Sequence, residues 1–115
     1  MTKHALFAFN GEAMCFVHVL LNAIDLYEND YEVKVIIEGS ATKLVKELAD
    51  ESAPFSNLYH KVKDLGLIDC VCKACAAKMG SLEAATEQNL PLCDDMKGHP
   101  GIRQYFEKGF NVITF

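Results

Sequence analysis

The sequence predicts a single α/β domain spanning residues 1–115, built as a three-layer α/β/α sandwich around a five-stranded, mostly parallel sheet. A chain of 115 residues has the length of one ordinary domain. Half of its residues are apolar and 23% are charged, as in a typical globular protein. Short apolar or β-branched runs alternate with helical patterns, and this order favours a parallel sheet covered by helices on both faces.

The first strand is expected at residues 3–10, because five apolar residues follow one another there without alternation. An Asn-Gly pair ends this run, and apolar residues at helical spacing predict a long helix over 12–29. The apolar stripe of that helix is wide enough to cover the sheet and a second surface. A β-branched run predicts the second strand at 31–38, and Ser40 is the expected N-cap of a short helix over 41–49.

The middle of the chain continues the same alternation. After a proline, a helix is expected over 56–65, and Gly66 ends it. The third strand is predicted at 67–72. One or two helical pieces follow over 73–78 and 81–88, on either side of a glycine.

The last part of the chain supplies the remaining strands. A short fourth strand is predicted at 90–93, and a polar loop with glycine and proline follows over 94–101. The last helix is expected over 102–108 and ends at Gly109, and the fifth strand covers 111–115. In parallel sheets, chemistry gathers outside the carboxyl ends of the strands. The loops that follow the strands are therefore the expected site.

Charge and hydropathy exclude several partners. The net charge is −5, with 11 basic residues against 16 acidic ones, and the basic residues are scattered. Nucleic acid and anionic membrane surfaces are therefore not expected partners, because both need a basic patch. No apolar stretch approaches the ~20 residues of a membrane helix, and the apolar run near the start is too short for a signal peptide. The expected location is cytoplasmic.

Five cysteines are the most informative feature of the chain. Their odd number and the helix-rich pattern argue against a disulfide framework, so free thiols are expected. Cys15 on the first helix and Cys70 in the third strand are interpreted as buried small hydrophobes. Cys72 ends the third strand, Cys75 lies in the following helical turn, and Cys93 ends the fourth strand. If those strands are neighbours, the last three thiols converge at one edge of the sheet.

The chemistry of this cluster has several interpretations. The start of a helix and the neighbouring Lys73 both favour a thiolate, which attacks sulfur electrophiles and binds soft metals. Structural zinc is one interpretation, with Cys72 and Cys75 as a C-x-x-C half-site, Cys93 as a third ligand and His99 as a fourth. A dithiol redox centre is another. Sulfur transfer is the third interpretation, in which one thiolate carries a sulfur atom as a persulfide.

Two further expectations concern the first helix. His18 lies in its apolar stretch and is expected in the core or at a subunit interface. The excess of apolar surface on this helix predicts a homo-oligomer, because large exposed apolar patches usually mark interfaces.

The order of these segments resembles the DsrE-like family of sulfur-relay proteins, and most closely its YchN-type branch. The resemblance covers nearly the whole chain. It is carried by the opening strand and long helix, by 33–42, by the cysteine segment 68–75 and by the terminal strand 109–115.

This resemblance implies a three-layer α/β/α fold, a cytoplasmic location and assembly into trimers or hexamers. It also implies a persulfide-carrying cysteine just after the third strand, a position that Cys72 occupies here. Cys75 matches a second thiol of the YchN-type branch that the single-thiol sulfur carriers lack. This second thiol would allow release of the sulfur through a disulfide.

The resulting expectation is a sulfurtransferase or sulfur carrier that holds sulfane sulfur on Cys72, with Cys75 assisting. Cys93, Lys73 and His99 are its expected site neighbours. Sulfur donor and acceptor proteins are its expected partners, and no cofactor is required. The alternatives are a non-enzymatic oligomeric binding module with a cysteine-ligated zinc, and a dithiol redox protein.

Overall fold

Strands and helices alternate along residues 2–115, the part of the chain that the computed structural model describes. The strands are β1 (Lys3–Ala8), β2 (Glu32–Ile37), β3 (Ile68–Cys72), β4 (Leu92–Cys93) and β5 (Phe110–Thr114). The α-helices are α1 (Ala13–Glu28), α2 (Lys43–Glu47), α3 (Ser56–Asp64), α4 (Lys73–Lys78), α5 (Leu82–Glu87) and α6 (Arg103–Glu107). A 3₁₀ turn, η1 (Gly39–Thr42), precedes α2.

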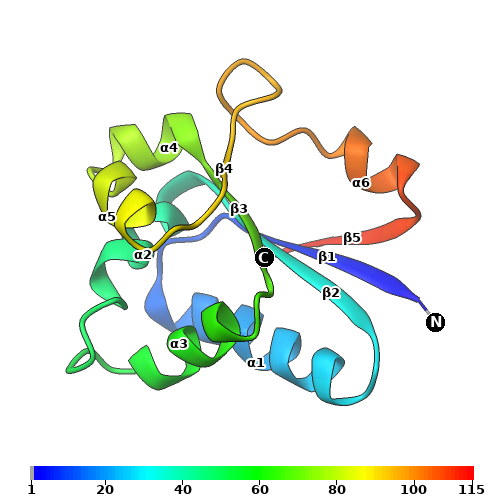
Figure 1. Cartoon of the computed structure of the whole chain (residues 1–115), viewed down its shortest axis with the longest axis horizontal. Coiled ribbons are helices and arrows are strands. Elements are labelled where there is room, and N and C mark those ends of the chain that lie inside the picture. The colour runs from blue at the N-terminus through cyan, green and yellow to red at the C-terminus, as the bar shows by residue number, and fades with distance from the viewer. Residues whose placement is uncertain (1) are drawn as a thin grey trace.

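The strands form one parallel sheet in the order β4-β3-β2-β1-β5. From β1 to β4 each new strand is added on the same side, and the chain then crosses back to place β5 beside β1. Because parallel crossovers are right-handed, this reversal moves the last helix to the opposite face of the sheet. Figure 1 shows α6 on one side of the sheet and α1 and α3 on the other.

The thicker core lies on the face that α1 to α5 cover. Leu6, Val35 and Val71 project from the three central strands into this core, and all three are at most 1% exposed. Phe16 and Leu20 of α1 pack against them. Burial of each such side chain contributes about 1.5–3 kcal/mol to folding, so this cluster is the main source of the domain's stability.

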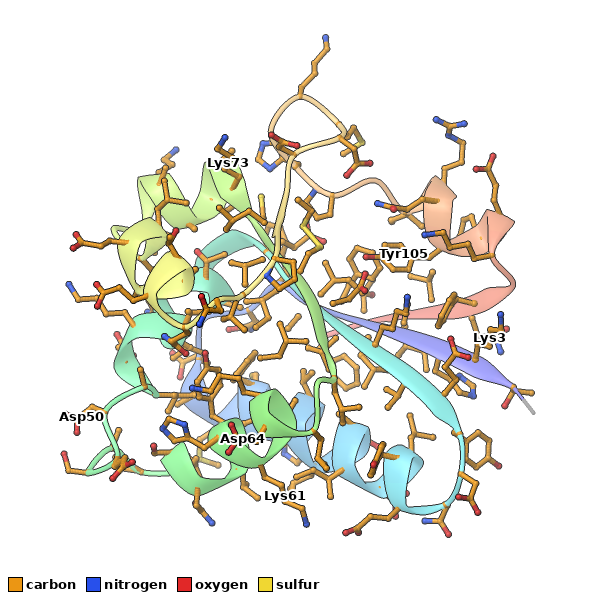
Figure 2. The ribbon with its side chains drawn as sticks, in the orientation of Figure 1. Lys3, Asp50, Lys61, Asp64, Lys73 and Tyr105 are labelled. Atoms are coloured by element: carbon orange, nitrogen blue, oxygen red, sulfur yellow. A yellow bond between two sulfur atoms is a disulfide. The ribbon has the colours of Figure 1, made fainter. Side chains whose placement is uncertain are left out.

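The opposite face has a smaller core beneath α6. Tyr105 of α6 is 2% exposed and meets the ring of Phe7 edge-on, with the centroids 5.3 Å apart. Figure 2 shows Tyr105 between α6 and the sheet. Its hydroxyl donates to the carboxylate of Asp69, which also pairs with Lys34 at 3.5 Å. This face therefore carries a half-buried polar network beside its aromatic contacts.

The structure confirms the predicted fold class and the order of elements, with local differences. The fourth strand is only Leu92–Cys93, and the segment expected as one helix over 41–49 is divided between η1 and α2. Ser40 makes no N-cap bond. Its hydroxyl instead accepts from the backbone N–H of Gly11 at 2.8 Å, which ties the β2–α2 connection to the β1–α1 loop. Within residues 2–115, none of the helices combines the length and apolarity needed to cross a membrane.

Candidate functional site

β3 and β4 end beside each other at the carboxyl edge of the sheet. They are parallel neighbours, and Cys72 is paired in register with Cys93. α4 begins at the residue after Cys72, and the 94–101 loop leaves β4 at the same edge (Figure 1). The sequence left open whether the third and fourth strands are neighbours, and the structure shows that they are. This edge therefore brings together a strand end, a helix start and a long loop.

Cys72 and Cys75 form a C-x-x-C pair around the start of α4. Cys72 has extended backbone angles (φ −61°, ψ 118°) and is the N-cap of the helix. Its sulfur accepts a hydrogen bond from the backbone N–H of Cys75, with an N···S distance of 3.4 Å. Cys72 is fully buried, whereas Cys75 is partly exposed. The pair therefore presents one sheltered thiol and one accessible thiol.

His99 joins the two cysteines from the 94–101 loop. Its Nδ1 lies 3.1 Å from the sulfur of Cys72 and 3.5 Å from the sulfur of Cys75. The two sulfurs and this nitrogen all lie within 4.8 Å of one another. With the ring proton on Nε2, Nδ1 is an acceptor that faces both S–H groups. The structure thus brings Cys72, Cys75 and His99 together as the sequence predicted.

A tight turn holds His99 in place. The backbone N–H of Met96 donates to the carbonyl of His99 at 2.8 Å, and Gly98 between them has φ +93°. The Gly98 carbonyl accepts from the backbone N–H of Ala74 in the first turn of α4 at 3.0 Å. A Cβ atom on Gly98 would lie 3.0 Å from the Ala74 methyl group. Only glycine combines this positive φ with so close an approach.

The electrostatics of Cys72 differ from the expectation of a depressed pKa. Burial, the neighbouring Cys75 and the negative charge of Glu38 raise the pKa of the Cys72 thiol to about 11. The N–H···S bond at the start of α4 lowers the pKa but is outweighed by burial. The expectation was wrong because it considered the helix terminus and not the loss of hydration. The resting thiol is therefore protonated at neutral pH.

Glu38 follows β2 and adds a carboxyl group to the same edge. Its side chain is half-buried, and burial raises its pKa while the nearby His99 lowers it. The charge of Glu38 also acts on Cys72. Sequence reasoning placed Glu38 in one of the loops at the expected edge, directly after a central strand, but gave the residue no role. Gly98 likewise lies in the loop expected over 94–101 without an assigned role, and the usable signal was a glycine immediately before the candidate histidine.

Cys70 and Cys93 form a disulfide that the sequence analysis did not expect. Their Cα atoms lie 5.7 Å apart on neighbouring strands, within the range that a disulfide requires. Cys70 is buried as predicted, but it is not a free thiol. Cys93 is likewise not a third thiol of the cluster, because its sulfur is bonded to Cys70 on the face covered by α6. The free thiols of the site are those of Cys72 and Cys75.

The other predicted residues lie farther from the chemistry. Lys73 lies at the start of α4 (Figure 2) and is half-exposed, with its Nζ 3.9 Å from the carboxylate of Asp94. Cys15 was expected to be buried and His18 to lie in the core or at a subunit interface, and both are exposed on α1. They line a groove of about 400 Å³ with Phe115. Cys15 was misassigned because the buried stripe of α1 runs through Phe16, Val19 and Leu20, and the same arrangement keeps His18 out of the core.

Fold and site together define a class: an all-parallel, five-stranded α/β domain with a Cys-Cys-His cluster at the carboxyl edge of its sheet. The chain belongs to the family of the uncharacterized protein MJ0733 of Methanocaldococcus jannaschii. The two are 36% identical over 97 residues, which cover 84% of this chain and 77% of the relative. No protein-family model matches the chain.

Two further comparisons give a partial sequence match and a structural match. An uncharacterized protein of Archaeoglobus fulgidus is 44% identical over 50 residues, which cover 44% of this chain and 82% of the relative. The structure of a conserved protein of unknown function, BT1422 from Bacteroides thetaiotaomicron, superimposes with a TM-score of 0.73. The superposition covers 98% of this chain and 94% of the other chain. Because the two sequences are only 14% identical, the match shows a shared fold and nothing more.

Proposed function

We propose that this is a small cytoplasmic sulfur-handling protein that carries sulfane sulfur as a persulfide on Cys72, with Cys75 assisting. One observation carries the proposal: two free thiols and the Nδ1 of His99 converge within 4.8 Å at the carboxyl edge of the sheet. The resemblance of the cysteine segment and terminal strand to the DsrE-like family supports the same function.

Loading requires a thiolate on Cys72, and His99 is positioned to generate it. Its Nδ1 lies 3.1 Å from the sulfur and can accept the thiol proton. The thiolate attacks the terminal sulfur of a donor persulfide, and a new S–S bond forms as the donor S–S bond breaks. The donor leaves as a thiolate and takes up the proton that His99 holds. The products are the Cys72 persulfide and the donor thiol.

The terminal sulfur of the Cys72 persulfide can be released by two routes. An acceptor thiolate can attack the terminal sulfur, which restores the Cys72 thiolate. Alternatively, the Cys75 thiolate attacks the inner sulfur of the persulfide, hydrosulfide leaves and a Cys72–Cys75 disulfide forms. The second route ends in an oxidised pair, so a dithiol reductant must restore the protein. Cys75 lies in the first turn of the helix that Cys72 caps, and the two sulfurs lie within 4.8 Å of each other.

The different burial of the two thiols suits this division of roles. Fully buried Cys72 would keep a persulfide away from water and competing thiols, while partly exposed Cys75 marks the side from which partners approach. The exposed Met14 and Leu21 of α1 support homo-oligomerisation, with trimers or hexamers as the proposed assemblies.

Intact-mass measurement tests the proposal directly. The native, unreduced protein is incubated with glutathione persulfide in a Cys15→Ser background, because exposed Cys15 would otherwise load independently. We expect a gain of one sulfur atom that a thiol reductant reverses. Cys72→Ser should abolish this gain, and Cys75→Ser should preserve loading but slow hydrosulfide release. Unchanged loading in Cys72→Ser would contradict the assignment.

A dithiol redox role is the second candidate, because the same C-x-x-C pair holds both sulfurs close together. Exposure of the native protein to a mild disulfide oxidant separates the two functions. With the oxidant, the protein should rapidly lose the mass of two hydrogen atoms if Cys72 and Cys75 form a disulfide. This loss, together with no gain of sulfur from the persulfide donor, would favour redox exchange over sulfur transfer.

A further inference from the structure

The donor atoms of Cys72, Cys75 and His99 have the composition of a soft-metal site. Two thiol sulfurs and one imidazole nitrogen are the ligands that Zn²⁺ binds most often in proteins. The observed S···N distances are 3.1 and 3.5 Å, and all three atoms lie within 4.8 Å of one another. Tetrahedral zinc, with bonds of about 2.3 Å to sulfur and about 2.1 Å to nitrogen, places a sulfur and a nitrogen about 3.6 Å apart and two sulfurs about 3.8 Å apart. The cluster thus needs only small adjustments to surround one ion.

The backbone already orients these three side chains. Cys72 and Cys75 are held by the strand end and first helical turn, and the turn carrying His99 is bonded to α4 through Gly98 and Ala74 at 3.0 Å. The N–H···S bond from Cys75 to Cys72 would stabilise negative charge on a ligating sulfur. A site assembled before the ion arrives requires little ordering of the chain on binding.

The number of protein ligands determines the kind of site. Cys93, the nearest further cysteine, is bonded to Cys70 and cannot complete a four-ligand set. Sites with three protein ligands keep a fourth position for water or an outside ligand, in contrast to closed structural sites.

We propose that Cys72, Cys75 and His99 bind one Zn²⁺ through two thiolates and Nδ1, with a fourth position open to an outside ligand. Binding releases the two thiol protons, and the proton of the ring stays on Nε2. The metal and a persulfide compete for the same sulfur of Cys72. The zinc-loaded protein therefore cannot accept sulfur on Cys72. Metal binding itself does not depend on the proposed sulfur function.

Cobalt titration of the purified, unreduced protein under anaerobic conditions tests this site. We expect one equivalent of Co²⁺ to produce a thiolate-to-cobalt charge-transfer band and the visible bands of tetrahedral cobalt, and Zn²⁺ to remove both. Cys15→Ser is the matched control, since it removes a free thiol outside the cluster, and it should titrate like the unaltered chain.

Cys75→Ser is the main variant, because Cys75 is partly exposed and its replacement preserves the core. It should lower the charge-transfer intensity by about half and weaken binding more than the ~10–100-fold that loss of an outer-shell contact costs. His99→Gln should weaken binding while keeping the full charge-transfer intensity of the two thiolates. Absence of the bands at saturating cobalt, or their persistence in the Cys72→Ser/Cys75→Ser double variant, would overturn the proposal.

Sulfur loading of the metal-free protein separates this proposal from the preceding one. Loading without cobalt binding overturns the metal site alone. Cobalt binding without loading supports the metal site and removes the sulfur function. When both occur, one equivalent of Zn²⁺ should block loading, and continued loading at full zinc occupancy would refute the shared use of Cys72.

Discussion

Alkylation of the native protein with iodoacetamide probes the ionisation of Cys72, because only a thiolate reacts at an appreciable rate. Burial, Cys75 and Glu38 raise the pKa of Cys72 from an ordinary 9.0 to about 11. At pH 7 the ionised fraction therefore falls by about 100-fold relative to an ordinary thiol. We expect Cys72 to react at least about 100-fold more slowly than a cysteine peptide in the same tube.

The pH dependence distinguishes a raised pKa from simple steric shielding. A raised pKa favours the neutral thiol, so the rate at Cys72 should rise tenfold per pH unit from about pH 7 to about pH 10. The alkylation rate of the cysteine peptide should level off at about pH 8.5–9. Shielding alone would lower the rate at every pH but leave the levelling point unchanged. The readout is peptide-resolved mass spectrometry, which follows Cys72 and Cys75 separately.

A plateau for Cys72 below about pH 9 would refute this reasoning, because it would show that burial does not dominate the pKa of the thiol. Cys15→Ser is the appropriate background, since alkylation of that exposed residue could disturb the protein. Cys75→Ser should keep most of the steep pH dependence, because burial is the largest of the causes that raise the pKa. The loading of sulfur on Cys72 should show the same rise with pH.

Three further predictions concern the frame around the site. Gly98→Ala would hold an alanine at positive φ and bring its methyl group to 3.0 Å from the Ala74 side chain. It should therefore lower the free energy of unfolding in urea by about 1–3 kcal/mol. Alkylation of Cys72 should become faster, because the turn moves away from the thiol. Replacing both Cys70 and Cys93 by alanine removes a link across 23 residues and should cost about 3 kcal/mol in the same assay, and an unchanged midpoint would argue against the bond in solution. Sedimentation should show an oligomer that Leu21→Glu on α1 dissociates, and a monomeric unaltered chain would contradict that prediction.

The central part of the site was predictable because it is local. Cys72 and Cys75 are three residues apart, and the strand-to-helix pattern places such a pair around the first turn of a helix. The fold class was predictable for a similar reason, since the order of alternating apolar runs limits the possible topologies to a few. The direction of the Cys72 pKa shift was not predictable, because burial depends on every segment packed around the thiol.

The sequence by itself determined the alternation of strands and helices, the edge where chemistry gathers and the spacing of the two thiols. Only the tertiary structure decided which contacts the distant residues make at that edge. His99 reaches Cys72 across 27 residues, and Cys93 bonds Cys70 rather than joining the free thiols. Contacts within a few residues follow from backbone geometry, which local sequence controls. Contacts between distant residues follow from strand order, side-chain facing and loop conformation, and packing of the whole core selects these.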